Sequence, residues 1–162
     1  CGSSAHIDAL MQHPLARAVR ADKLCLAALN ATLRHYLAGE ALSEIPVLRM
    51  IARPAEEIRQ TAGKWLTHLQ AGGHSHTPVL SIVPGESRVG GGSLPGTTLP
   101  TYLLAIEDDM VRPDELAQRL RHQATPVVGR IQDDRFLLDP RTVLAEQEDQ
   151  LLEAISVALR PT

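Results

Sequence analysis

Arg17 and Arg20 are the residues of this 162-residue chain whose type and spacing point most directly to chemistry. Residues three apart in helical or near-helical backbone share one side, so the two guanidinium groups can reach the same ligand. Each guanidinium is a permanently charged fork that matches the oxygens of phosphate or carboxylate. The spacing therefore suggests an anion site, in which the arginines position charge and transfer no proton. The alternative is two solvated arginines on a helix surface.

Lysine is scarce, because the chain contains only Lys23 and Lys64. A lysine amine is what a carbonyl cofactor or substrate needs to form a Schiff base. Lys64 falls opposite the apolar face of its predicted helix, so we expect it to be solvated. Lys23 stands beside Asp22 at the start of a long predicted helix and is a candidate for a lesser role in an active-site cleft or an interface.

Composition excludes several classes of protein. The formal net charge is -3 and aromatic residues make up 2% of the chain, so an independent nucleic-acid-binding module is not expected. Cys1 and Cys25 are too few for a disulfide framework or a zinc site, which favours a reducing cytoplasm. Cys25 is predicted to be buried.

No apolar run reaches the roughly 18 residues that suggest a membrane span. His74 and His76 lack a third ligand, so no metal site is predicted.

Apolar periodicity predicts helices in both halves of the chain. A short helix near Ser4–Gln12 is interrupted at His13-Pro14. A long helix follows, in which leucines at three- and four-residue steps form one buried face: Leu26, Leu29, Leu33 and Leu37. Pro46 begins a short connector to Ile51. Three further helices are predicted from Pro54 to Gly72, from Pro113 to about His122, and from about Ala145 onward.

Short apolar runs predict four strands, at 79–83, 101–106, 127–131 and 135–138. Asp133-Asp134 between the last two is predicted to be a tight hairpin turn. The order of helices and strands predicts an α+β fold, an antiparallel sheet with helices covering one face.

Four blocks of the sequence, in this order, resemble the bacterial selenocysteine synthase family. They are HPLARAVRADKLCLAALNATLRHYL from His13, IPVLRMIARPAEEI from Ile45, VGGGSLPG from Val89, and PVVGRIQDDRFLLDPRTV from Pro126. The family's Ser-Gly-Asp-Lys-like motif, which carries the pyridoxal 5'-phosphate (PLP) lysine, is absent. The resemblance therefore implies a C-terminal fragment, with no catalytic residue of its own.

The resemblance also implies an architecture and a reaction. The fold would be the small C-terminal domain of a fold-type I PLP enzyme with a leading long helix, residues 1–53 linking to the large domain and 54–162 forming the small domain. The full enzyme would convert seryl-tRNA(Sec) to selenocysteyl-tRNA(Sec) with selenophosphate, as a cytoplasmic homo-oligomer whose absent large domain holds PLP. The rival interpretations are a related PLP lyase acting on a small amino acid or amino-sugar acid, and a purely structural oligomerisation domain.

Site residues follow from the same resemblance. Arg17 and Arg20 match positions that hold the phosphate-like group of the selenium donor. Arg130 and Arg141 are possible cleft residues, because small-domain arginines of related enzymes bind substrate carboxylates, although an ester on tRNA has none. The glycines of VGGGSLPG are interpreted as a turn or a close backbone approach between strands.

Overall fold

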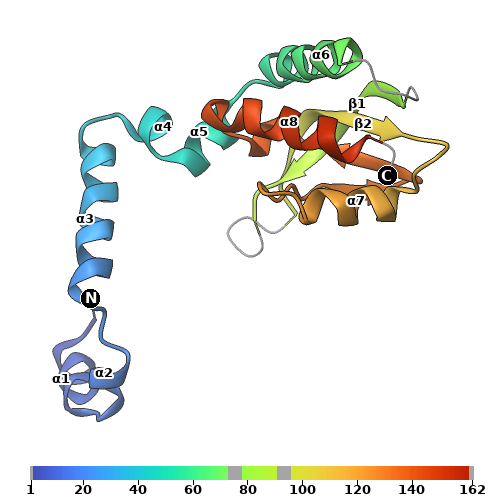
Figure 1. Cartoon of the computed structure of the whole chain (residues 1–162). Helices are drawn as coiled ribbons and strands as arrows, with labels where there is room; N and C mark the ends of the chain where they lie inside the picture. Colours follow the sequence, from blue (N-terminus) through green and yellow to red (C-terminus); the bar gives the residue numbers. More distant parts are fainter. Residues whose placement is uncertain (1, 73–77, 91–95, 161–162) are drawn as a thin grey trace. The chain divides into compact units, whose positions relative to one another are not determined.

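The computed structural model describes residues 2–72, 78–90 and 96–160 (Figure 1). The chain divides into two compact units, unit 1 (Cys1–Ile45) and unit 2 (Pro46–Thr162). Unit 1 contains the helices α1 (Ser4–Gln12), α2 (Leu15–Ala18), α3 (Lys23–Leu37) and α4 (Ala41–Glu44). Unit 2 contains α5 (Pro46–Ala52), α6 (Ala55–Ala71), β1 (Val79–Arg88), β2 (Thr98–Glu107), α7 (Pro113–Arg121), β3 (Arg130–Gln132), β4 (Arg135–Leu138), the short 3-10 turns η1 (Pro140–Thr142) and η2 (Ala145–Gln147), and α8 (Glu148–Ala158).

The helix boundaries of unit 1 follow local sequence signals. The break at His13-Pro14 separates α1 from α2, as predicted, because proline disfavours helix at the residue before it. The N-terminus of α3 is capped by Asp22, whose side chain accepts a hydrogen bond of 2.8 Å from the backbone N–H of Cys25. Gly39 lies just after α3 at a φ of 75°, a left-handed conformation that suits glycine at a helix end.

The leucine stripe of α3 is not buried, and here the prediction from periodicity was wrong. Its side chains keep half or more of their surface exposed: Leu26 56%, Leu29 54%, Leu33 50% and Leu37 89%. Cys25 is exposed as well, contrary to expectation. Periodicity identifies an apolar face but not what covers it. None of the described residues of unit 1 is buried, so its helices do not enclose a hydrophobic core of their own.

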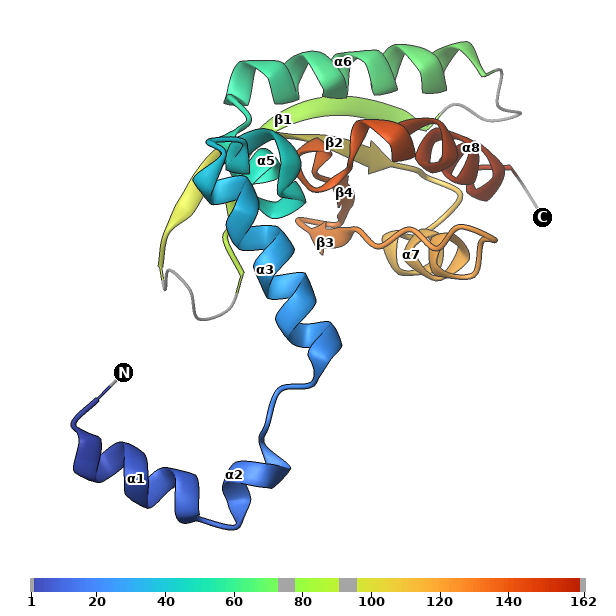
Figure 2. The ribbon, with the colours of Figure 1, turned by 90° about the vertical axis from the view of Figure 1, so that its left-hand side faces the viewer.

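Unit 2 is built on a four-stranded antiparallel sheet in the order β1-β2-β4-β3. Helices α6, α7 and α8 cover one face of it, and Figure 2 shows α6 running along β1. Trp65 of α6, Leu104 of β2, Phe136 of β4 and Ile155 of α8 are fully buried in this core. The predicted α+β fold, with an antiparallel sheet covered by helices, is confirmed.

Two local expectations for unit 2 needed correction. The segment from Pro46 is a helix, α5, and not a connector, because proline is well tolerated in the first turn of a helix. The strand predicted at 127–131 is confined to Arg130–Gln132. Val127 is buried, and its N–H donates to the carbonyl of Leu120, so this stretch follows the end of α7 before the chain joins the sheet.

The β3–β4 hairpin has the predicted turn. Asp133 and Asp134 both lie at positive φ, 52° and 56°, as a two-residue hairpin turn of the favoured hand requires. Next to it, a Cβ on Gly129 would lie 2.4 Å from Phe136 Cζ, so only glycine fits against that ring.

The second face of the sheet carries a small apolar cluster of its own, formed by Leu103, Ala105 and Leu137 with Val83 beside them. Strand β1 ends the sheet, and Pro84 lies in its middle, paired in register with Tyr102.

Candidate anion site and the arginines of the chain

Arg17, Arg20 and Lys23 line one hollow of unit 1, with a volume of about 990 Å³. We call it the anion hollow. Helix α2 supplies Arg17, the segment after α2 supplies Arg20, and the first turn of α3 supplies Lys23. The complete lining is Met11, Ala16, Arg17, Arg20, Ala21, Asp22, Lys23 and Leu26. Three of the sequence-predicted candidates therefore lie around a single space.

The charge of the anion hollow favours a multiply charged anion. Three cationic side chains face one carboxylate, that of Asp22, which is already engaged by the Cys25 amide. Within the described residues, the ion pairs involve neither Arg17, Arg20 nor Lys23. Two guanidinium groups free of internal carboxylates can donate charge-assisted hydrogen bonds to one bound oxyanion.

Asp22 is the residue of this site whose role the sequence reasoning missed. Hydrogen bonds from Cys25, above all from its backbone amide, lower the pKa of Asp22 below its ordinary value. The available signal was an aspartate directly before a helical run, which is the preferred position for a capping residue. The cap fixes where α3 begins and hence where Lys23 is placed.

Replacing Asp22 by alanine is expected to loosen the first turn of α3. Because the folded-state pKa is lowered, the stabilisation by the carboxylate is present above pH 3.8, the ordinary value, and is lost as the pH falls through the lower folded value. The protection of the Cys25 amide from hydrogen exchange, measured relative to the intrinsic rate at the same pH, should fall in Asp22→Ala, and in the unmodified chain below pH 3.8. Asp22→Asn retains a capping oxygen and should keep its protection both above and below pH 3.8. Equal protection of the Cys25 amide in all three proteins would contradict the capping role.

Arg130 lies on the second face of the sheet of unit 2. Its Nη1 donates to the backbone carbonyl of Glu86 at 3.1 Å, and its Nη2 lies close above Gly85. Together with Arg88, Arg135 and Leu103 it lines a groove of about 390 Å³. Arg135 faces Asp133 at 3.7 Å. Arg130 is thus a residue of unit 2, whereas Arg17 is a residue of unit 1.

Arg141 is buried, with 4% of its surface exposed, and its guanidinium binds backbone carbonyls. Nη1 donates to the carbonyls of Met50, Ile51 and Arg53, and Nη2 donates to that of Pro100 at 2.7 Å. The guanidinium thus joins the C-terminal end of α5 to β2. Burial lowers the pKa of Arg141, partly offset by the nearby charge of Asp139. These contacts give Arg141 a structural role.

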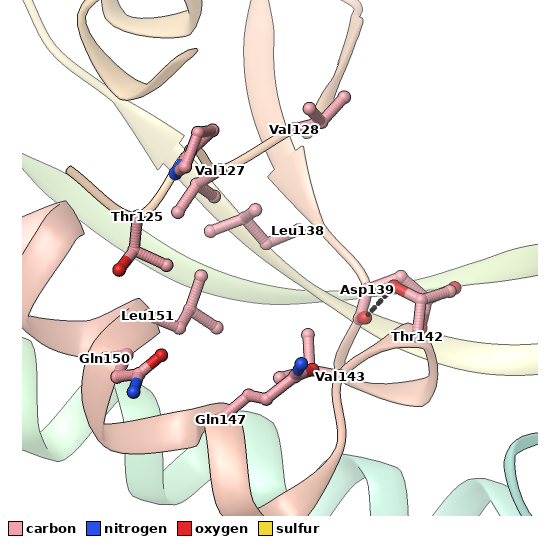
Figure 3. A pocket seen from close by; sticks show the side chains of 11 residues that line it. Thr125, Val127, Val128, Leu138, Asp139, Thr142, Val143, Gln147, Gln150 and Leu151 are labelled. Carbon is pink, nitrogen blue, oxygen red and sulfur yellow. Dashed lines mark hydrogen bonds between the residues drawn. The ribbon is translucent and has the colours of Figure 1, made fainter. Parts of the chain in front are cut away.

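Asp139 organises the neighbouring polar cluster. Its carboxylate accepts hydrogen bonds from the hydroxyls of Ser87 and Thr101 and from the backbone N–H of Arg141. Its backbone carbonyl accepts from Thr142, on the wall of a cavity of about 230 Å³ (Figure 3). The other side chains around this cavity are neutral and largely apolar: Thr125, Pro126, Val127, Val128, Leu138, Val143, Gln147, Gln150 and Leu151. Its lining includes none of the candidate arginines.

Other sequence candidates lie outside the described residues, among them His74, His76 and most of the VGGGSLPG loop. Gly90 at the edge of that loop has a φ of 51°, which suits a glycine in a turn. Within residues 2–72, 78–90 and 96–160, no group of three or more side chains is arranged to hold a metal ion. No helix in the same ranges is long and apolar enough to span a bilayer.

Comparison with known proteins places these features in a family. The family model described as "SelA: L-seryl-tRNA selenium transferase" matches residues 1–144. Among curated proteins, the L-seryl-tRNA(Sec) selenium transferase of Geobacter sulfurreducens is 46% identical over 95% of this chain and 33% of its own length. The proteins of the same name from Desulfovibrio desulfuricans and Carboxydothermus hydrogenoformans are 44% and 40% identical, over 94% and 91% of this chain. The chain thus spans about a third of the length of these relatives. The residues that match the family model include those that line the anion hollow and those that form the sheet. It belongs to the L-seryl-tRNA selenium transferase (SelA) family.

Proposed function

We propose that this chain forms the C-terminal part of an enzyme that converts seryl-tRNA(Sec) into selenocysteyl-tRNA(Sec), with selenophosphate as selenium donor. The proposal is supported by relatives that carry the name L-seryl-tRNA(Sec) selenium transferase and match nearly the whole chain. The single observation within the molecule that carries it is the anion hollow, where Arg17, Arg20 and Lys23 meet. Selenium donors of this type are oxyanions, and the hollow offers the charge to hold one.

In this proposal Arg17 and Arg20 bind the phosphate-like group of the donor and orient it. Guanidinium groups stay protonated at every physiological pH, so they stabilise negative charge on the departing phosphate without moving protons. Lys23 adds a third positive charge at the rim. Asp22 keeps the helix end, and therefore Lys23, in place through its bond to the Cys25 amide.

The cofactor expected for the family, PLP, does not fit the residues of this chain. A PLP site needs a lysine in a pocket and an acidic or basic partner for the pyridine nitrogen. Lys64 lies on the exposed face of α6, and Lys23 lies at an open hollow whose one carboxylate already caps a helix. We therefore assign PLP to the portion of the family protein that this chain does not span, and derive no step through it here.

The remaining assignments are part of the same proposal. Residues 1–53 link the small domain to the large PLP domain, and residues 54–162 form the small domain, with Arg130 as a possible cleft residue. The assembled protein is a cytoplasmic homo-oligomer. The burial of Arg141 favours a structural contribution from that residue.

The test is an assay of the full-length family protein that contains this chain. We expect seryl-tRNA(Sec) and selenophosphate to give selenocysteyl-tRNA(Sec), detected by mass spectrometry of the alkylated amino acid after deacylation. Free serine should give no product. Release of a keto acid from a free small amino acid or amino-sugar acid, without any tRNA requirement, would instead support a lyase and overturn the proposal. If a folded protein catalysed neither reaction, the result would favour the interpretation of this chain as a purely structural oligomerisation domain.

Selective recognition of tRNA is not expected in this chain by itself. Its net charge of -3, its two lysines and its 2% of aromatic residues provide little phosphate attraction or base stacking. In fluorescence anisotropy at physiological salt, the purified chain should bind tRNA(Sec) no more tightly than a serine elongator tRNA. A clear preference for tRNA(Sec) would place the recognition surface in this part of the enzyme.

A further inference from the structure

Three arginines of unit 2 come from three different strands and line one groove. Arg88 belongs to β1, Arg130 to β3 and Arg135 to β4, and the volume of the groove is about 390 Å³. We call it the arginine groove. Arg130 pairs directly with Leu137, and directly opposed residues share a face of the sheet. Arg135 lies two residues before Leu137 in β4 and therefore belongs to the same face.

The guanidinium of Arg130 is held in place by the backbone around it. A Cβ on Gly129 would clash with the ring of Phe136, so the backbone just before Arg130 packs directly against that ring. A Cβ on Gly85 would lie 3.3 Å from Nη2 of Arg130, which places the guanidinium close to the backbone of β1. Nη1 donates to the carbonyl of Glu86 at 3.1 Å, and within the described residues the hydrogen bonds engage only this nitrogen of the guanidinium. A positioned cation with donors to spare loses little freedom when it binds a ligand.

Arg88 and Arg135 add positive charge that the neighbouring carboxylates do not fully neutralise. In the part of the chain that the structure describes, Arg88 takes part in none of the ion pairs. Arg135 faces Asp133 across 3.7 Å, and the side chain of Asp133 is 68% exposed. Such a long, solvated ion pair contributes little, so a phosphate can replace the carboxylate. Three guanidinium groups against the carboxylates of Glu86 and Asp133 leave one positive charge in excess, in a chain of net charge -3.

The mixed lining of the arginine groove fits a nucleotide better than a simple anion. Glu86 and Asp133 disfavour a bare phosphate or an acidic peptide, but carboxylates accept hydrogen bonds from ribose hydroxyl groups. Guanidinium planes stack on bases, and Leu103 adds apolar surface to the lining. The volume lies near the lower end of the range of about 300 to 1,000 Å³ for small-molecule sites. The groove therefore accommodates about one nucleotide, and a longer strand would continue beyond it.

We propose that the arginine groove binds one nucleotide unit of the tRNA substrate, with Arg88 and Arg135 on backbone phosphates and Glu86 and Asp133 facing ribose hydroxyl groups. This assignment rests on the proposed function, because that function brings RNA to the enzyme. Phosphate and ribose are common to all tRNAs, so these contacts add affinity and orient the strand without selecting a sequence. The groove thus agrees with the expected lack of preference for tRNA(Sec) in this chain.

The double variant Arg88→Gln/Arg135→Gln tests the groove in the full-length family protein. In anisotropy titrations of fluorescein-labelled tRNA(Sec), its Kd should rise about tenfold at about 0.1 M salt, since two phosphate contacts are lost. The slope of log Kd against log salt concentration should fall by about one for each arginine removed. Arg112→Gln/Arg121→Gln removes the same charge from exposed positions of unit 2 outside the groove, and both values should stay near those of the unmodified protein. Equal Kd values in the two double variants would overturn the proposal.

Binding is measured without selenophosphate, so its result is separate from that of the proposed reaction. An enzyme that transfers no selenium, but whose groove variant loses affinity for tRNA, would contradict the reaction and support the groove. An enzyme that transfers selenium and binds tRNA equally well in all three proteins would contradict the groove alone.

Competition with adenosine monophosphate distinguishes a strand of RNA from a free nucleotide as the ligand. At about 1 mM it should displace little tRNA, because one nucleotide makes only a fraction of the contacts of a strand. Micromolar binding of adenosine monophosphate that is lost in Arg88→Gln/Arg135→Gln and kept in Arg112→Gln/Arg121→Gln would assign the groove to a free nucleotide and overturn the proposal.

Discussion

Replacing both Arg17 and Arg20 by alanine in a full-length family enzyme is expected to lower kcat/KM for selenophosphate by roughly 10²- to 10⁴-fold. A hydrogen bond to a charged group contributes about 1.5 to 3 kcal/mol, so two lost partners remove about 3 to 6 kcal/mol of transition-state stabilisation, at about 1.4 kcal/mol for each factor of ten. The melting temperature should change little, because both side chains are exposed. Each single variant is expected to retain part of the activity.

Arg34→Ala is the matched control, since Arg34 is another exposed arginine, in the last turn of α3 and outside the lining of the anion hollow. Its selenium transfer should stay near that of the unmodified enzyme. Turnover close to normal in the Arg17→Ala/Arg20→Ala double variant would show that these arginines are solvated surface residues. A large fall in melting temperature would instead assign them to packing.

Replacing Arg141 by methionine is expected to reduce the free energy of unfolding of unit 2 by about 3 to 5 kcal/mol. The change leaves four backbone carbonyls without their donor, and each unsatisfied buried group costs about 1 to 3 kcal/mol, with water recovering part of the loss. It also removes the positive charge beside Asp139. Urea unfolding followed by the fluorescence of Trp65, the only tryptophan of the chain and fully buried in unit 2, measures the effect.

Arg141→Lys should rescue little of this stability, because one ammonium cannot reach both the carbonyls at the end of α5 and that of Pro100 in β2. Arg121→Met, at an exposed position at the end of α7, should change unfolding by less than about 0.5 kcal/mol. If Arg141→Met unfolded at the same urea concentration as Arg121→Met, the buried guanidinium would not stabilise the junction between α5 and the sheet.

Features set by neighbouring residues were predicted well from the sequence. The helix predicted from Pro54 to Gly72 corresponds to α6, whose buried residues Ile58, Ala62, Trp65 and Leu69 follow three- and four-residue steps that return to one side of a helix. The Asp133-Asp134 turn followed from its position between two short apolar runs. For the candidate site, residue type and spacing brought Arg17 and Arg20 together, and they do line one hollow.

Contacts between residues far apart in the sequence could not be predicted from local sequence patterns. The four carbonyls that bind Arg141 lie 41 to 91 residues away in the sequence, so no local pattern distinguishes its guanidinium from a solvated one. The same holds for the leucines of α3, where the pattern identified an apolar face correctly but could not say what covers it. Asp139 accepts hydrogen bonds from Ser87 of β1 and Thr101 of β2, and no local sequence pattern predicted these contacts.

The proline in strand β1 has a consequence for how the protein behaves at high local concentration. A ten-residue strand at the end of a sheet is a template on which strands of other molecules can assemble into aggregates. Pro84 has no N–H to offer such a strand, and the exposed charges of Glu86 and Arg88 follow it. Wherever many copies of this chain come close together, the interruption disfavours edge-to-edge pairing of their sheets.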